Sequence, residues 1–323
     1  MRKFVLIVGA SPDRINHNAV MRRYVCDGFN DVLGSNSSCH CSLENAIDEI
    51  QLKRPSLVLI FGSCMPDVCD YGPIRDKCDR YGSILTFWLH DDPYEFDFNF
   101  RAAEVADWIF TNDRWASLHY EHPQVYFLPM AASVRAHYRA WSESKNYDVF
   151  FCGVGFPNRV ALLSDLQSVL KKLRVCIKGA DWPSSLSIAQ NQRLSNGEWS
   201  DVCASSSITL NIGRTLHLAN KRYQLDATTP GPRTFEAAMA GTVQMMFVDG
   251  LEVADFFEPE KEIILFDNPK DFSAKLEELL LNKDRLELIA LNAQKRAIRD
   301  HTYAARAQQI IDCIGGELLL QEE

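Results

Sequence analysis

Short apolar runs alternate with polar loops along the first half of the chain. Residues 56–61 (SLVLIF) and 83–89 (SILTFWL) are apolar at consecutive positions, which is typical of parallel strands buried on both faces. Stretches with apolar residues on one helical face, such as residues 42–53, separate the runs. The predicted strands of this half are residues 4–8, 56–61, 83–89, 108–110 and 125–128. Strands that alternate with helices predict a doubly wound α/β domain.

A second series of strands and helices begins at residue 147. Its predicted strands are residues 147–152, 173–177, 207–212, 242–248 and 262–266, and its predicted helices include residues 160–172, 233–240, 269–281 and 283–314. The polar stretch 131–145 is interpreted as an interdomain connection, and the tail, residues 315–323, is expected to fray or to pack on the surface. We therefore predict two α/β domains, residues 1–143 and 144–323, facing each other across a cleft.

In the first domain, polar side chains follow the predicted strands, and the richest of these loops reads W-L-H-D-D-P-Y at 88–94. Loops at the carboxyl ends of parallel strands converge on one crevice. Aromatic faces beside carboxylates suit a polyol, so Trp88 and Tyr94 are candidate acceptor-binding residues. His90, Asp91 and Asp92 are candidate catalytic residues, since a histidine or carboxylate could act as a general base. In the alternative interpretation the aspartates only end the strand and cap the next helix.

In the second domain, residues 229–236 (TPGPRTFE) predict a Gly/Pro turn that leads into a helix. The free N–H groups of a first helical turn, together with Arg233, form a site suited to phosphate. Gly231 and Thr234 belong to the same turn. Glu236 lies one turn further on, where its carboxylate could accept two hydrogen bonds from a ribose diol. In the alternative interpretation this is a capped core helix whose glutamate faces solvent.

A second candidate phosphate site is the segment 153–159 (GVGFPNR), between a predicted strand and a predicted helix. It resembles the dinucleotide fingerprint, but Asn158 replaces the third glycine and no acidic residue follows about 20 positions later. The pattern therefore disfavours a dehydrogenase and still suits a diphosphate. Gly155 would let the backbone approach it, and Arg159 would supply several donors. Further polar residues near strand ends, assigned to the same donor site, are Lys178, Asn211 and Arg214.

Composition narrows the possible partners. The 323-residue chain carries a net charge of −9, which argues against non-specific binding to nucleic acid. No segment is apolar for long enough to cross a membrane, and the first residues do not form a signal sequence, so a cytoplasmic protein is expected. The ten cysteines form no paired zinc motif, and Cys39-His40-Cys41 lacks a second ligand pair. We expect neither a metal site nor a cofactor.

Four stretches together resemble a known family: WLHDDPY at 88–94, FTNDR at 110–114, DVFFCGVGFPNRV at 148–160 and TPGPRTFEAAMAG at 229–241. They are similar to the bacterial CgeB-like glycosyltransferases, the spore-maturation-protein group within the GT-B clan of group 1 transferases. The DHTY sequence at 300–303 also fits.

The resemblance implies a GT-B fold with two Rossmann-like domains, in which the C-terminal one binds a nucleotide-sugar donor and the N-terminal one binds the acceptor. It implies no obligatory metal. Glu236 matches the ribose-binding glutamate, Arg159 a diphosphate contact, and His90 the histidine near the donor sugar. Related retaining transferases often have a second glutamate eight positions before the first; here that residue is Thr228, which leaves the sugar contacts and the stereochemical outcome open.

The leading hypothesis is a metal-independent glycosyltransferase. It would move a sugar from a nucleoside-diphosphate-sugar, UDP-sugar being favoured, to a hydroxyl of a glycan, protein or small-molecule acceptor. Two other classes stay open. One is a nucleotide-sugar epimerase or NAD(P)-dependent oxidoreductase with two similar domains, and the other is a non-catalytic protein that binds a nucleotide-sugar.

Overall fold

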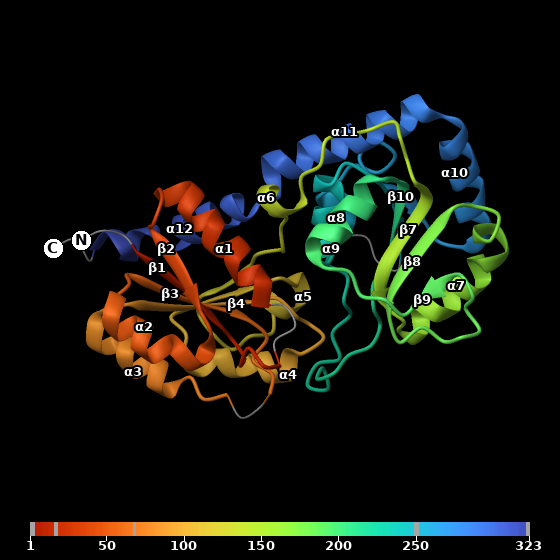
Figure 1. The fold of residues 1–323 in the computed structure, drawn as a ribbon. Helices are drawn as coiled ribbons and strands as arrows, with labels where there is room; N and C mark the ends of the chain where they lie inside the picture. Colours follow the sequence, from red (N-terminus) through yellow and green to blue (C-terminus); the bar gives the residue numbers. More distant parts are fainter. Residues whose placement is uncertain (1–3, 16–18, 67–68, 249–251, 321–323) are drawn as a thin grey trace. The chain divides into compact units, whose positions relative to one another are not determined.

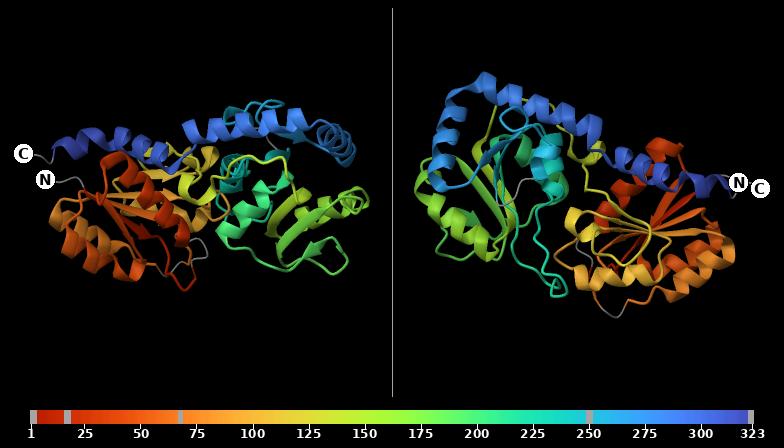
Figure 2. Two further views of the ribbon diagram at one scale, coloured as in Figure 1. Left: turned by 45° about the horizontal axis from the view of Figure 1, so that its top comes forward. Right: turned by 180° about the vertical axis from the view of Figure 1, so that it is seen from behind.

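The computed structural model describes residues 4–15, 19–66, 69–248 and 252–320. The chain divides into two compact units, whose ribbons are drawn in Figures 1 and 2. Unit 1 contains the chain up to Met130, the segment His217–Thr229 and the chain from Tyr303 onward. Unit 2 contains Ala131–Leu216 and Pro230–Thr302.

Unit 1 is built on a six-stranded sheet in the order β2-β1-β3-β4-β5-β6, with every neighbouring pair parallel. Its strands are β1 (Val5–Gly9), β2 (Ser38–Cys41), β3 (Leu57–Gly62), β4 (Ile84–Leu89), β5 (Trp108–Thr111) and β6 (Val125–Phe127). Each residue of β3 and β4 is buried, as their continuous apolar sequences predict.

Helices cover both faces of this sheet (Figure 1). They are α1 (Ala19–Leu33), α2 (Ala46–Lys53), α3 (Gly72–Tyr81), α4 (Phe96–Asn99), α5 (Arg114–Ser117) and α12 (Tyr303–Leu320), with short 3-10 turns at Leu43–Asn45 and Phe100–Glu104. The last helix packs closely on the first at Gly28, which has no side chain. A Cβ at this position would lie 2.5 Å from the backbone of Tyr303. Thus α12 belongs to unit 1 although it ends the chain.

Unit 2 contains a second parallel sheet, in the order β12-β11-β10-β7-β8-β9. Its strands are β7 (Tyr147–Val154), β8 (Val175–Ala180), β9 (Ala189–Gln190), β10 (Ser206–Asn211), β11 (Val243–Phe247) and β12 (Ile264–Phe266). Its helices are α6 (Val134–His137), α7 (Pro157–Leu170), α8 (Asn196–Ala204), α9 (Pro232–Met239), α10 (Pro269–Leu281) and α11 (Lys283–Asp300), with a 3-10 turn at Glu252–Asp255. The predicted pair of parallel α/β domains is confirmed.

The strand order of unit 2 reverses between β7 and β10. After β7 the chain builds outward through β8 and β9, and it then returns to place β10 on the other side of β7. A reversal of this kind leaves a crevice at the carboxyl ends of the two strands, which is where open α/β sheets bind ligands. Residues that follow β7 and β10, and the start of α9 after β10, therefore have the best placement for a site.

The unit boundaries differ from the predicted division at residue 143. The stretch 131–145, interpreted as a connection, contains α6 and belongs to unit 2. The segment His217–Thr229 belongs to unit 1 because its backbone bonds there: the amides of Leu218 and Ala219 donate to the carbonyl of Tyr94 at 3.0 and 2.9 Å. Such long-range pairing has no local sequence signal.

The predicted helix 283–314 is two helices, α11 and α12. The chain turns at His301, which is buried with its ring among those of Phe235, Phe256 and Phe257. The carbonyl of His301 accepts a hydrogen bond from the Ala132 amide at 2.9 Å, so it is not used within a helix. Helix α12 continues to Leu320, into the tail that was expected to fray or to pack on the surface, and residues 321–323 lie outside the described residues.

Candidate functional site

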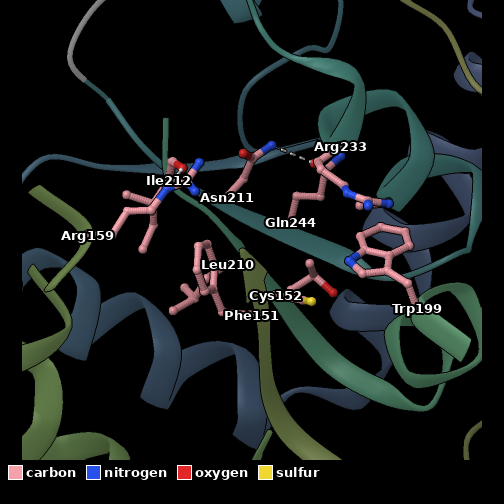
Figure 3. Close-up of a pocket in the computed structure, with 11 residues that line it drawn as sticks. Phe151, Cys152, Arg159, Trp199, Leu210, Asn211, Ile212, Arg233 and Gln244 are labelled. Carbon is pink, nitrogen blue, oxygen red and sulfur yellow. Dashed lines mark hydrogen bonds between the residues drawn. The ribbon is translucent and has the colours of Figure 1, made fainter. Parts of the chain in front are cut away.

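Unit 2 has a small cavity, of about 50 Å³, at the carboxyl ends of β7 and β10. Figure 3 shows Arg159 and Arg233 at opposite ends of this cavity. The rest of its lining is Phe151, Cys152, Trp199, Thr209, Leu210, Asn211, Ile212, Ala237 and Gln244. The two arginines come from the segments that the sequence singled out as phosphate sites. The structure therefore brings both segments to the point where the strand order reverses.

The guanidinium of Arg159, in the first turn of α7, is bonded to strand-end carbonyls. It donates to the carbonyls of Ile212 at 3.0 Å and Val154 at 3.1 Å. The neighbouring Asn158 amide donates to the carbonyl of Gly213 at 2.9 Å, while its Oδ1 is buried with no hydrogen-bond partner in the described part of the chain. These two side chains hold the ends of β7 and β10 together and leave one buried acceptor at the start of α7.

Position 155 requires a glycine because the backbone of Asp181 passes close to it. A Cβ at this position would lie 2.6 Å from the carbonyl oxygen of Asp181. The Gly155 amide also donates to the carbonyl of Ala180 at 2.8 Å. The sequence predicted that this glycine lets the backbone approach a diphosphate. In the structure the close approach is to the loop after β8, so the need for glycine is explained without a ligand.

At the start of α9, side chains tie the helix to the ends of two strands. Gly231 is the exposed N-cap residue, and a Cβ there would meet nothing within 4 Å. The Asn211 amide donates to Thr234 Oγ1 at 2.7 Å and to Gln244 Oε1 at 3.3 Å, the second bond being visible in Figure 3. Gln244 in turn donates to the carbonyl of Thr234. This network fixes the first turn of α9 beside the cavity, with open space in front of it.

Glu236 is buried, contrary to the alternative interpretation in which it faced solvent. Its side chain is 4% exposed, and its Oε2 accepts a hydrogen bond from Arg233 at 2.6 Å. The Arg233 side chain is 43% exposed and lies over the Trp199 ring, 4.5 Å from the centroid. A buried carboxylate thus lies directly behind a partly exposed arginine at the edge of the cavity.

His137 is a site residue that the sequence analysis missed. Its Nδ1 accepts a hydrogen bond from the Ser133 amide at 3.0 Å, so the proton of the neutral ring lies on Nε2, which is 3.6 Å from Glu236 Oε1. Burial, helped by Arg233 and Arg139 and opposed by Glu236, holds the pKa of His137 below its ordinary value. The glutamate therefore has arginine on one oxygen and a neutral histidine N–H facing the other.

Two further predicted donor residues lie around this cluster. Lys178 is on β8, beside Cys152 of β7, and its ammonium makes no hydrogen bond or ion pair within the described residues. Arg214 follows β10, with its guanidinium 6.0 Å from the centroid of the Phe156 ring. Neither lines the cavity, whereas Arg159, Asn211 and Arg233 do.

In unit 1, His90 follows β4 and is paired with Asp91. Its Nδ1 is 2.7 Å from Asp91 Oδ2, and its ring packs on Phe61. Burial opposes the charged form of the ring, but Asp91 and Glu95 outweigh it and raise the pKa of His90 above its ordinary value of 6.5. Glu95 is itself buried and accepts a hydrogen bond from Ser63. The pair His90–Asp91 has the arrangement of a general base with an orienting carboxylate.

Asp92 holds unit 1 together instead of pointing outward. It is 1% exposed, and its carboxylate accepts hydrogen bonds from Asn99 at 2.8 Å, Thr111 at 2.6 Å and Tyr120 at 2.6 Å. Burial raises its pKa against the effect of these bonds, which favour the charged form. Both oxygens are used within the protein, so the predicted contact of Asp92 with the reacting groups does not fit this geometry.

We expect Asp92→Ala to lower the free energy of unfolding by about 3 kcal/mol, because three buried donors would lose their acceptor. Chemical denaturation followed by tryptophan fluorescence measures the change. Asp226→Ala, at an exposed aspartate of the same unit, serves as the matched control. A fully stable Asp92→Ala protein with impaired turnover would contradict the structural role.

The predicted acceptor-binding role of Trp88 is wrong. Its side chain lies in the core, 1% exposed, with the indole N–H donating to the carbonyl of Leu128 at 3.1 Å. The reason is that β4 is central in its sheet and buried on both faces, so its aromatic side chains cannot reach a ligand. Tyr94 is partly exposed, and its ring lies 5.2 Å from that of His217. Tyr94 is therefore the accessible one of the two.

Comparison with solved structures decides the fold. The chain resembles the Anabaena protein HepE in complex with UDP and glucose with a TM-score of 0.65 and 12% identity, over 97% of this chain and 99% of that one. It resembles a glycosyltransferase from Rickettsia africae with a TM-score of 0.65 and 11% identity, over 99% of both chains. The fold is GT-B. Identities this low establish the GT-B fold alone.

Two sequence comparisons give matches to parts of the chain. Residues 159–312 match the family model described as "Glycosyl transferase-like". The chain is also 28% identical over 99 residues to the spore protein CgeB of Bacillus subtilis (strain 168), a match covering 29% of this chain and 31% of that protein. The matched segment is thus under a third of the relative's length. The family match supports the predicted glycosyltransferase.

Three further features of the chain concern metal binding, the cysteines of β2 and membrane spanning. Within the described ranges, no group of three or more acidic, histidine or cysteine residues could hold a metal ion. Cys39 and Cys41 lie on β2, where burial raises the pKa of both thiols, that of Cys41 to about 12. In the part of the chain that the structure describes, every helix is too short or too polar to span a bilayer.

Proposed function

We propose that this protein is a glycosyltransferase that moves a sugar from a UDP-sugar to an acceptor hydroxyl. The observation that carries the proposal is the buried Glu236, held between Arg233 and His137 at the start of α9 and next to the cavity of unit 2. A carboxylate in this place can accept two hydrogen bonds from a ribose diol. HepE, of similar fold, was solved with UDP and with UDP-glucose, which favours UDP as the nucleotide.

Donor binding would exchange the partner of Glu236. In the structure Arg233 donates a hydrogen bond to Oε2 of Glu236, and the Arg233 side chain is partly exposed. The ribose hydroxyls would take this oxygen, and Arg233 would turn toward the diphosphate. The open first turn of α9 would add backbone N–H groups and its dipole. Positive groups aimed at a leaving diphosphate stabilise the charge that develops as the glycosidic bond breaks. We propose that these groups serve without a metal ion.

His90 would act on the acceptor in this proposal. A neutral imidazole can take the proton of an attacking hydroxyl, and Asp91 would orient the ring and stabilise the imidazolium. The CgeB-like assignment would place the protein in a spore-related group, and it rests on the segment shared with CgeB. The proposed acceptor is a glycan, a protein or a small molecule, and a cytoplasmic location is proposed with it.

The proposal is tested by a thermal-shift screen of the purified protein with UDP, GDP, dTDP, CMP, NAD and NADP. A ligand that binds the folded state alone raises the unfolding temperature. We expect a selective shift with UDP, and then release of UDP from at least one UDP-sugar. A shift with NAD or NADP alone would favour an oxidoreductase. Binding of UDP without turnover of any UDP-sugar would favour a non-catalytic binding protein.

A further inference from the structure

The outer face of α11 carries a ridge of apolar side chains that are exposed among the described residues. Its inner face packs on α9 and β11 through buried residues including Leu286, Ile289 and Ala293. On the opposite face, Leu288 is 60% exposed, Leu291 40% and Ile298 43%. Figures 1 and 2 show α11 along the outside of unit 2. Exposed apolar side chains scattered singly are normal, whereas three on one ridge of one helix give an apolar stripe that a partner would bury.

Two charged residues complete this ridge, and both lack a partner. Asp284 and Lys295 are exposed, and neither makes an ion pair or a hydrogen bond within the described residues. Four other charged residues of α11 are paired: Arg285 with Glu260 and Glu278, and Arg296 and Arg299 with Asp300. The ridge Asp284, Leu288, Leu291, Lys295 and Ile298 has the spacing of alternating a and d positions of heptads.

We propose that α11 is a self-association surface, on which two copies of the chain pair their α11 helices antiparallel about a two-fold axis. In this register Leu288 lies opposite Leu291 of the second copy, and Asp284 lies opposite Lys295 of the second copy. The two-fold axis repeats each contact, so four leucines form an apolar centre with an ion pair at either end. The same register brings Ile298 toward the end of α10 in the second copy, where Leu281 is 81% exposed.

The arrangement has the properties of a small isologous interface. An apolar centre with a polar rim is the usual anatomy of a protein contact, and a two-fold axis requires that the ridge be complementary to itself. The helix has 18 residues and is about 27 Å long, so one helix from each copy makes a small interface. Interfaces at the low end of the size range are transient, and we expect a dissociation constant on the order of micromolar.

An anionic membrane surface is the main competing partner for exposed leucines near basic residues. Charge disfavours it. Asp284 lies on the ridge itself and Glu287 adjoins Leu288, while the chain carries a net charge of −9. Negative charges near the contact face repel anionic lipid headgroups, whereas they match Lys295 of a second copy.

Sedimentation velocity of the full chain at increasing concentration tests the proposal first. We expect a monomer–dimer equilibrium for the natural sequence. Leu288→Asp should leave the protein monomeric at about 200 µM, since each dimer would bury two new unpaired carboxylates. Leu52→Asp is the matched control, because Leu52 is a 75% exposed leucine on α2 in unit 1, and it should dimerise normally.

Exchange of charges tests the register. Asp284→Lys and Lys295→Asp should each weaken the dimer by roughly fivefold or more, because each change places like charges opposite each other twice. The double variant Asp284→Lys/Lys295→Asp should restore the affinity of the natural sequence. These variants are on the surface and should keep the natural unfolding temperature, which is measured in parallel.

Three results would overturn the proposal. The first is a natural protein that stays monomeric at every concentration. The second is a dimer that survives Leu288→Asp, because it would use another face. The third is a monomer that co-sediments with phosphatidylglycerol vesicles and loses this binding with Leu288→Asp, because the ridge would then bind membranes. None of these results bears on nucleotide binding in unit 2, so this test is independent of the proposed transferase activity.

Discussion

Replacing Glu236 with alanine is expected to weaken UDP binding about a hundredfold, as measured by isothermal titration calorimetry. Two hydrogen bonds from the ribose diol to a carboxylate would be lost, and each charge-assisted bond contributes about 1.5 kcal/mol or more. The effect should be large because Glu236 is 3% exposed, where water competes poorly for its oxygens. Loss of the carboxylate also frees Arg233, which can turn to solvent, so the protein should still fold.

Two further variants separate recognition of the ribose from general damage to unit 2. Glu277→Ala removes an exposed glutamate from α10 and should bind UDP like the natural protein. His137→Leu removes the N–H that faces Glu236 and should weaken UDP binding by a smaller factor, since the carboxylate itself stays. If the natural protein binds UDP and Glu236→Ala binds it with the same affinity, Glu236 does not bind the ribose. Absence of UDP binding in the natural protein would instead reject the proposed donor.

Much of the scaffold could be predicted because its signals are local. The apolar runs of β3 and β4 and the Gly/Pro turn before α9 each specify their own element. Once the strands alternate with helices, the parallel sheet follows, and so does the placement of polar strand ends at one edge. This is why Arg159, Asn211 and Arg233, distant in sequence, were assigned correctly to one neighbourhood.

The roles of individual side chains were harder to predict because they depend on distant partners. The sequence WLHDDPY does not show whether the ring of Trp88 faces a ligand or lies in the core. The ring is buried because β4 has a strand on each side. Nor does the sequence reveal that Asp92 would be surrounded by Asn99, Thr111 and Tyr120. His137 lies about 100 residues from Glu236, in a stretch without a motif, so only the fold brings the two together.

His90→Ala is expected to lower the turnover number about 10²- to 10⁴-fold, the usual contribution of a general base, while leaving UDP affinity unchanged. Release of UDP from the preferred UDP-sugar measures turnover, and calorimetry measures binding. UDP affinity should not change because His90 belongs to unit 1, whereas the proposed nucleotide site lies within unit 2. His40→Ala, at an exposed histidine on β2 of unit 1, is the matched control and should keep normal turnover.

The pH dependence distinguishes a base from a merely structural histidine. A general base must be neutral, so turnover should rise as the pH passes through the pKa of His90. Asp91 and Glu95 raise this pKa above 6.5 despite burial, so the rise should fall at a higher pH than for an ordinary histidine. Asp91→Asn removes the largest favourable charge, which lowers the pKa of His90 and should move the rise to lower pH. A profile that Asp91→Asn leaves in place would mean that another group takes the proton, and His90 would then be a structural residue of unit 1.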